Sequence, residues 1–199
     1  MTHLRANTIG DRPSLEEIEK ALTSATTPYK LVTITHVDTS TGVLSDIKSM
    51  AALVKAISPS TLIAVDGVCS VAVEEIRMDE WNIDIVLTAS QKAIGVPPGL
   101  CILFANPRAI DAFNSRKTPV PSYYANWKKW IPIMKAYEDR KPLYFATPAV
   151  QLIMALHVSL KQILSAPGGM EERFRKHIHA SNLMKDRMES LGLRMVRNI

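Results

Sequence analysis

The chain has 199 residues, 47% hydrophobic and 22% charged, so it is long and apolar enough to bury a core and is neither disordered nor fibrous. Lys and Arg outnumber Asp and Glu by 24 to 19, but this charge of +5 is spread along the chain, which argues against nucleic acid as a partner. Because no apolar stretch approaches the roughly 18 residues of a membrane span and the N-terminus lacks a signal-peptide pattern, we expect a protein that neither spans a membrane nor is secreted.

The first part of the chain alternates helical and strand patterns. The capping box Ser14-x-x-Glu17 predicts a helix over about 14–24. The β-branched run 31–35 is typical of a buried strand. Ser45 is expected to cap a second helix that ends near residue 57, and the run 61–65 predicts another buried strand, with Asp66 at its end.

Two further apolar runs, 83–88 and 100–105, are separated by the turn-like segment Gly95-Val-Pro-Pro-Gly99. This order of strands, polar loops and helices predicts an α/β fold. From residue 107 the chain is predicted to be mainly helical. The expected helices are 108–115, 149–164, and a long amphipathic helix that follows Gly168-Gly169 and ends at about residue 191. A Trp- and Pro-containing connection joins the first two, and residues 191–196 resemble the start of a strand.

The two cysteines, Cys69 and Cys101, lie among apolar neighbours without Cys-x-x-Cys spacing. We expect reduced, buried thiols, which fits an intracellular, reducing compartment. His177 and His179 make a poor metal pair, because side chains two residues apart on a helix point to different sides and no further ligand completes a set. The sequence therefore predicts no metal site.

Three polar segments follow predicted strands, and in open α/β sheets ligands bind at the carboxyl ends of strands. The first is the hydroxyl-rich loop 35–42, which contains Ser40. The second is Asp66, a carboxylate that is costly to bury without a partner. The third is Lys92, a lone lysine between apolar strands that we expect to be buried. Each has an ordinary alternative, namely a simple turn, a helix cap or a solvated charge.

Lys92 and Asp66 together indicate a specific chemistry. A partly desolvated lysine has a lowered pKa, and its free amine can form a Schiff base. Enzymes that use pyridoxal 5'-phosphate (PLP) need such a lysine, and they also need a carboxylate against the pyridine nitrogen, which makes the ring a better electron sink. One strand-to-strand excursion separates Asp66 from Lys92, so both can emerge at the same sheet edge. A salt bridge or two solvated charges remain the alternatives.

Several strings around these residues carry a resemblance. They are Asp66-Gly-Val68, Asp84, Ser90-Gln-Lys92-Ala93, Pro97-Pro98-Gly99, Thr39–Val43 and Tyr144–Pro148. Together they resemble class-V aminotransferases, in particular the alanine–glyoxylate and serine–pyruvate group, over nearly the whole chain. The serine-glutamine-lysine-alanine string differs from the histidine-lysine form of cysteine desulfurases, so transamination is favoured over desulfuration.

The resemblance implies roles for five residues near the cofactor. Lys92 would bind PLP covalently and move the substrate proton, which makes it the catalytic residue. Asp66 would bind the pyridine nitrogen, and Val68 would press on the ring. Ser40 would approach the ring, and Gln91 would contact the phosphate.

The resemblance also implies a homodimer with shared active sites, in which Tyr144 and Thr147 reach the phosphate of the neighbouring subunit's cofactor. The implied partners are small molecules, an amino acid and a 2-oxo acid, with no nucleic acid or membrane. The implied location is intracellular, in the peroxisome, mitochondrion or cytoplasm.

The implied fold is the large domain of PLP-dependent transferases of fold type I, an α/β architecture that is expected to be incomplete here. Residues 1–166 would belong to the PLP-binding domain, and 167–199 would form a linker helix and the start of a C-terminal domain. The family's N-terminal arm with its phosphate-binding turn, expected before Leu31, and the C-terminal domain with its carboxylate-binding arginine would both be absent.

The implied activity is transfer of an amino group from alanine or serine to glyoxylate, which yields glycine. The alternative is a truncated, catalytically inactive fragment that acts only by pairing with a full-length homologue or has no independent function. In either case we expect exposed apolar surface and marginal stability of the isolated chain.

Overall fold

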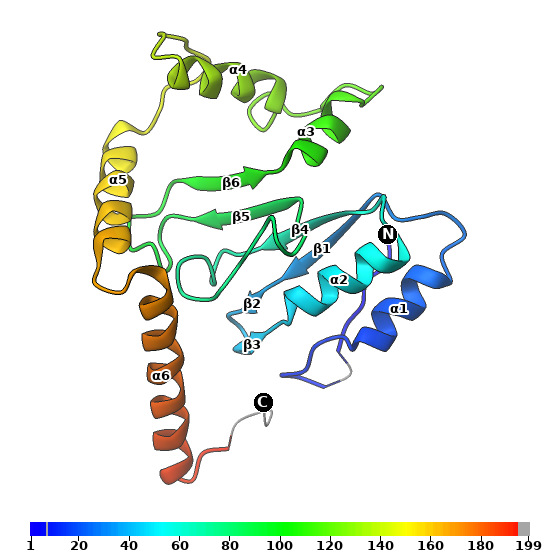
Figure 1. Cartoon of the computed structure of the whole chain (residues 1–199), viewed down its shortest axis with the longest axis vertical. Coiled ribbons are helices and arrows are strands. Elements are labelled where there is room, and N and C mark those ends of the chain that lie inside the picture. Colours follow the sequence, from blue (N-terminus) through cyan, green and yellow to red (C-terminus); the bar gives the residue numbers. More distant parts are fainter. Residues whose placement is uncertain (7, 195–199) are drawn as a thin grey trace.

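The structure, a computed structural model, describes residues 1–6 and 8–194. Its centre is a four-stranded sheet in the order β1-β4-β5-β6 (Figure 1). The strands are β1 (Leu31–Thr35), β4 (Leu62–Asp66), β5 (Ile85–Ala89) and β6 (Cys101–Ala105). β1, β4 and β5 are parallel, and β6 pairs antiparallel with β5. The predicted α/β fold is confirmed.

Helices α1 (Leu15–Thr23) and α2 (Ile47–Ile57) lie side by side (Figure 1). The predicted capping box starts α1, because the Ser14 hydroxyl accepts from the Glu17 N–H at 3.1 Å and the Glu17 carboxylate accepts from the Ser14 N–H at 2.8 Å. The cap of α2 differs from the prediction. Asp46, not Ser45, is the N-cap, and its carboxylate accepts from the Ser49 N–H at 3.1 Å.

The main core lies between these two helices and one face of the sheet. Its buried members are Ile18, Ile47, Met50, Ala51, Val54, Ile63, Val65, Ile83 and Val86. Since successive strand residues point to opposite faces, Asp66 lies on the other face, in register with Leu87 of β5, which in turn pairs with Leu103 of β6. That face is less covered, and Leu103 is 43% exposed.

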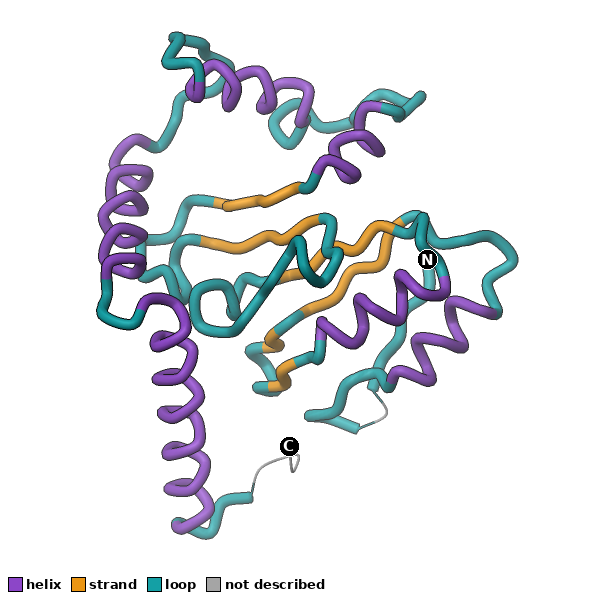
Figure 2. The backbone as a smooth tube through the Cα atoms, viewed as in Figure 1, coloured by secondary structure: helices purple, strands orange, loops and turns teal. Residues whose placement is uncertain are grey.

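Four helices follow β6: α3 (Pro107–Asn114), α4 (Trp127–Glu138), α5 (Val150–Ser165) and α6 (Gly169–Ser190). The backbone trace in Figure 2 shows α5 beside the ends of β5 and β6 and α6 continuing downward from it past the sheet, while α3 and α4 lie beyond β6. Helix α4 falls in the segment that the sequence predicted only as a connection. It forms despite Pro132, whose missing N–H removes one hydrogen bond inside the helix.

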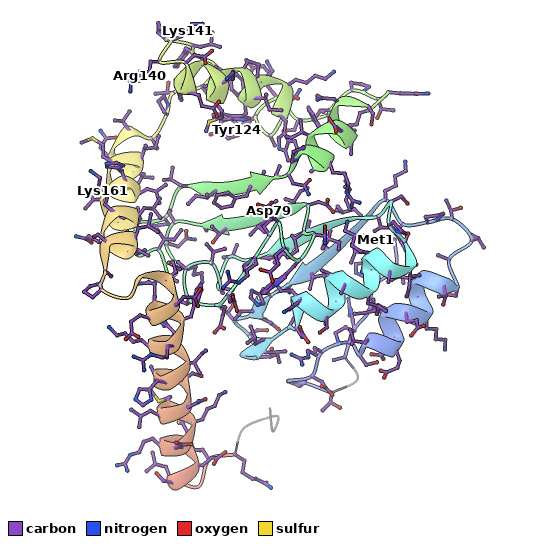
Figure 3. All side chains as sticks on the ribbon, in the orientation of Figure 1. Met1, Asp79, Tyr124, Arg140, Lys141 and Lys161 are labelled. Carbon is purple, nitrogen blue, oxygen red and sulfur yellow. The ribbon has the colours of Figure 1, made fainter. Side chains whose placement is uncertain are left out.

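Helix α6 has no buried residue, and Figure 3 shows its side chains projecting to several sides. The predicted strand at 191–196 is not seen in its described part, because Leu191 and Gly192 form a turn; residues 195 and 196 lie outside the described residues. Within the described part of the chain, no helix is long and apolar enough to cross a membrane.

The prediction of two buried cysteines is wrong for Cys101. Both thiols are free, but Cys69 is half-buried and Cys101 is exposed. Cys101 begins β6, and β6 is an edge strand of the described sheet with other exposed apolar residues, including Phe104 at 50%. The apolar neighbours of Cys101 in the sequence therefore did not indicate burial.

Candidate active site

The carboxyl ends of β1, β4 and β5 lie at one edge of the sheet, because the three strands are parallel. The strand register aligns Thr35 with Asp66, and Asp66 with Leu87. Ser40 follows β1, Asp66 ends β4 with Val68 two residues later, and Gln91 and Lys92 follow β5. The structure thus brings five of the seven predicted site residues to neighbouring strand ends, as sheets of this kind bring ligand-binding groups together.

Asp66 is the last residue of β4 and is half-buried. One carboxylate oxygen, Oδ1, accepts from the Val68 N–H at 3.0 Å, which holds the start of the loop. The Asp66 carbonyl accepts from the His36 N–H at 3.0 Å and so ties the ends of β1 and β4. Among the described residues no other hydrogen bond reaches the Asp66 side chain, so Oδ2 is available to a ligand.

Ser40 lies in a tight hairpin between the two-residue strands β2 (Val37–Asp38) and β3 (Val43–Leu44). The Asp38 carboxylate organises the turn: it accepts from the Ser40 N–H at 2.9 Å and from the Ser40 hydroxyl at 2.7 Å. These hydrogen bonds lower the pKa of Asp38. Because the Ser40 hydroxyl donates to Asp38, it can offer its lone pairs to a ligand.

Gln91 and Lys92 begin the loop between β5 and β6, and Ser90 fixes its shape. The buried Ser90 hydroxyl donates to the Pro97 carbonyl at 2.8 Å, and the Ser90 carbonyl accepts from the Val96 N–H at 3.0 Å. The loop therefore closes on itself at its base. Gln91 and Lys92 stand outside this closed base, since both are exposed.

The exposure of Lys92 corrects the expectation of a buried lysine. The residue follows β5 instead of lying within it, so the apolar strands on either side do not enclose it. Its amine forms no ion pair or hydrogen bond with the described residues. An amine without such a partner, on the loop that leaves the strand next to Asp66, is chemically free to take up a carbonyl compound.

Tyr144 and Thr147 do not join the other five residues. Both are exposed on the link between α4 and α5, and the Tyr144 hydroxyl and the Thr147 Oγ1 are hydrogen-bonded to each other at 2.5 Å. Within the described residues no hydrogen bond connects them to Ser40, Asp66 or Lys92.

His36 is a feature of this edge that the sequence reasoning did not single out. It follows β1, is only 4% exposed, and its Nδ1 is buried without a hydrogen-bond partner. Burial lowers the pKa of His36 to about 4, so the imidazole is neutral at pH 7. Its position directly after the strand 31–35, predicted to be buried, was the available signal, although β1 itself alternates exposed and half-buried residues.

A cavity of about 590 Å³ runs along β1, between this strand, α1 and the N-terminal residues. Thr35 and Asp38 line it near the carboxyl edge, but Asp66 and Lys92 do not. The described side chains also include no group of three or more His, Cys, Asp or Glu residues placed to hold a metal ion.

This architecture is shared with a solved alanine–glyoxylate aminotransferase from Nostoc sp. The two agree with a TM-score of 0.79 at 28% sequence identity, over 93% of this chain and 46% of that chain. The fold is therefore that of PLP-dependent transferases of fold type I, represented by about half of such a chain. The family model for class-V aminotransferases matches residues 3–198, and the protein belongs to this family.

Its relatives place it in the alanine–glyoxylate and serine–glyoxylate group of that family. The chain is 47% identical over 180 residues to alanine–glyoxylate aminotransferase 1 of Saccharomyces cerevisiae, covering 89% of this chain and 46% of the relative. It is 32% identical over 165 residues to serine–glyoxylate aminotransferase of Arabidopsis thaliana, covering 83% and 39%. The chain thus spans less than half the length of these relatives.

Proposed function

We propose that the protein acts as an aminotransferase that moves the amino group of alanine or serine to glyoxylate and yields glycine, with PLP bound through Lys92. The observation that carries the proposal is that neighbouring parallel strands end in Asp66, which has one carboxylate oxygen without a hydrogen bond, and in the loop with Lys92, whose amine has no partner among the described residues. The kinship to the yeast and plant enzymes supports the choice of alanine or serine as donor and of glyoxylate as acceptor.

The donors and acceptors at the carboxyl edge suit PLP. Asp66 Oδ2 would accept from the protonated pyridine nitrogen, while Oδ1 stays on the Val68 N–H and holds the carboxylate in place. Val68 would contact the ring from its place two residues further on. Ser40 would approach the ring, and the exposed Gln91 amide would donate to the phosphate.

When bound, PLP supplies an electron sink for the electron pair left at the substrate Cα. The chain's own part is binding and proton transfer. Lys92 Nζ would attach the cofactor, give way to the incoming amino group and then take the proton from Cα. Asp66 would keep the pyridine nitrogen positively charged by hydrogen bonding to its proton. The hydrogen bond from Ser90 that closes the base of the loop would hold Lys92 close to the substrate Cα, from which it takes the proton.

Tyr144 and Thr147 fit the same proposal as residues that serve a second subunit. Their hydroxyls form an exposed pair with no hydrogen bond to the other five site residues within the described chain, and a homodimer would let them reach the phosphate bound by the partner. Residues 1–166 would form the PLP-binding part, and 167–199 the passage to a further domain. An intracellular location, in the peroxisome, mitochondrion or cytoplasm, belongs to the same proposal.

The test is covalent trapping on the whole chain. Purified protein is mixed with PLP, its visible absorbance is recorded, and borohydride reduction followed by peptide mapping locates the modified lysine. We expect a stable adduct on Lys92 that is lost in Lys92→Ala. Lys161→Ala is the matched control, because Lys161 is an exposed lysine on α5 (Figure 3) and its loss should leave the adduct intact.

Trapping on Lys92 would be followed by an assay with alanine or serine and glyoxylate. Adducts scattered over several exposed lysines, with Lys92→Ala equal to the unaltered chain, would defeat the proposal. That result would favour the alternative, a polypeptide that is inactive alone and works only when paired with a full-length homologue. Mixing the chain with such a homologue and repeating the trapping would then test the alternative directly.

A further inference from the structure

Two loops carry the candidate site, and one side chain from a distant helix joins them. Arg173 lies in α6 and is part-buried where it contacts the loops. Its Nε donates to the Ala72 carbonyl at 2.6 Å, and its Nη2 donates to the Ala93 carbonyl at 2.8 Å. The first carbonyl belongs to the loop after β4, and the second belongs to the loop after β5. A single guanidinium thus bridges the two segments.

The two carbonyls lie close in sequence to the residues proposed to bind PLP. Ala93 directly follows Lys92, and Ala72 lies in the loop after Asp66, the loop that carries Val68. Ala72 adopts a positive φ of 75°, a conformation that non-glycine residues rarely take. Such a backbone persists when its surroundings hold it, and the bond from Arg173 is one such restraint.

The geometry of arginine makes this bridge stiff. Guanidinium is planar and its N–H groups point in fixed directions, so two carbonyls bound to Nε and Nη2 are held at a fixed separation. Arg173 forms no ion pair among the described residues, which leaves its donors directed at these carbonyls. A second contact places the same end of α6: the Arg77 guanidinium donates to the Glu171 carboxylate at 3.0 Å.

We propose that Arg173 is a positioning residue that sets the placement of Lys92 relative to Asp66 and thereby couples α6 to the cofactor site. The inference rests on the proposed function, since it assigns both loops to PLP binding. Movement of α6 would shift both loops together. Loss of the bridge would let them move independently, which would weaken PLP binding and change the pH at which the Lys92 adduct titrates.

The experiment compares three variants of the whole chain. Arg173→Met keeps an unbranched side chain but removes both donors. Arg173→Lys keeps the charge but offers one donor atom in place of the fork. Arg175→Met is the matched control, because Arg175 lies on the same helix, is 74% exposed and pairs with Glu172 of its own helix. Far-UV circular dichroism and the urea midpoint report whether each variant folds.

Three quantities are measured. Hydrogen exchange of the chain without PLP follows the amides of Val73 and Glu74 in one loop and of Gly95 and Val96 in the other, all hydrogen-bonded within their loops. Titration with PLP gives the dissociation constant, and the visible band of the Lys92 adduct gives its pH midpoint. For Arg173→Met we expect faster exchange in both loops, a dissociation constant raised about tenfold and a displaced midpoint.

Arg173→Lys should fall between Arg173→Met and the unaltered chain, and it carries the test if Arg173→Met does not fold. Arg175→Met should match the unaltered chain. The inference is overturned if Arg173→Met binds PLP within twofold with an unchanged midpoint, or if Arg175→Met has the same effects. If the unaltered chain forms no adduct on Lys92, the proposed function fails separately. The exchange data then decide the coupling: faster exchange in both loops retains it, and faster exchange in one or neither overturns it.

Discussion

Arg108 donates to both carboxylate oxygens of Asp84, from Nε to Oδ1 and from Nη2 to Oδ2, each at 2.8 Å. Asp84 is 1% exposed and also accepts from Lys55 at 2.9 Å and from the Ile63 N–H at 2.7 Å. The carboxylate therefore joins α2, β4 and α3 at the amino end of β5, opposite the edge that carries the candidate site. A buried carboxylate with this many donors has its hydrogen bonds satisfied. Removing any one of the donors would lower the free energy of unfolding substantially, because it would leave part of the buried charge without a partner.

Replacing Asp84 with Asn should destabilise the chain by about 3 kcal/mol, because the change removes the charge that Lys55 and Arg108 both face. Urea unfolding at pH 7 measures the effect. Glu138→Gln is the control, since Glu138 pairs with Lys135 at 3.5 Å on the surface and its loss should change little. Equal effects of the two substitutions would show that the Asp84 cluster does not stabilise the fold.

His36 predicts a loss of stability in mild acid. Burial lowers its pKa from 6.5 to about 4, so the unfolded chain takes up a proton between these pH values that the folded chain does not. The free energy of unfolding should fall as the pH drops through this window, by up to about 3 kcal/mol at roughly 1.4 kcal/mol per pKa unit. This loss of stability is absent above pH 6.5 and is complete near pH 4.

Urea unfolding at several pH values between 7 and 4 checks this, with His36→Gln as the variant. The glutamine cannot titrate, so its free energy of unfolding should fall less steeply than that of the unaltered chain. His3→Gln removes an exposed histidine and should keep the original slope. Parallel pH curves for the His36 variant and the unaltered chain would contradict the assignment.

Asp66→Asn should separate binding from turnover. The amide is similar in size, so PLP should still attach to Lys92, but a neutral group cannot hold a proton on the pyridine nitrogen as a carboxylate does. We expect turnover of alanine with glyoxylate to fall by about a hundredfold or more. The adduct's absorbance and the urea midpoint serve as controls. Turnover within threefold of the unaltered chain, with the adduct intact, would remove Asp66 from this role.

Much of the fold could be predicted because its signals are local. The capping box at Ser14 and the four apolar strand runs were located to within two residues. Helix α4 was missed because Pro132 lies inside it, and an internal proline argues against a helix when nothing but sequence is considered. The hairpin β2–β3 was missed because two-residue strands carry too few side chains to show an alternating pattern.

The sequence sufficed to predict which strand ends carry the candidate site, but not which residues surround its side chains. Parallel strands place Asp66 and Lys92 at one edge, and the sequence sufficed for that. Whether Lys92 is buried depends on which segments lie above the loop, so its exposure could not be foreseen. The bonds from Arg173 were equally hidden, because they join positions 80 and 101 residues apart through backbone carbonyls that no sequence pattern marks.

Gly99 lies where the loop that carries Lys92 packs against α5, so its replacement tests whether that contact constrains the loop. Its φ is +135°, which side-chain-bearing residues rarely adopt, and an added Cβ would lie 2.6 Å from Leu152 Cδ1 of α5. Gly99→Ala should therefore destabilise the chain by about 2–4 kcal/mol, combining backbone strain with overpacking. Urea unfolding measures this, and hydrogen exchange at Val96 should report loosening of the loop.

Gly95→Ala separates the two causes. Gly95 lies in the same loop with a φ of +76°, but an added Cβ would meet no atom within 4 Å. This variant should lose only the strain energy, about 1 kcal/mol. Because the tip of Leu152 is flexible, Gly99→Ala in combination with Leu152→Ala should recover part of the overpacking cost but none of the strain. If the two glycine variants lose equal stability, contact with α5 does not constrain the loop, and backbone conformation alone accounts for both glycines.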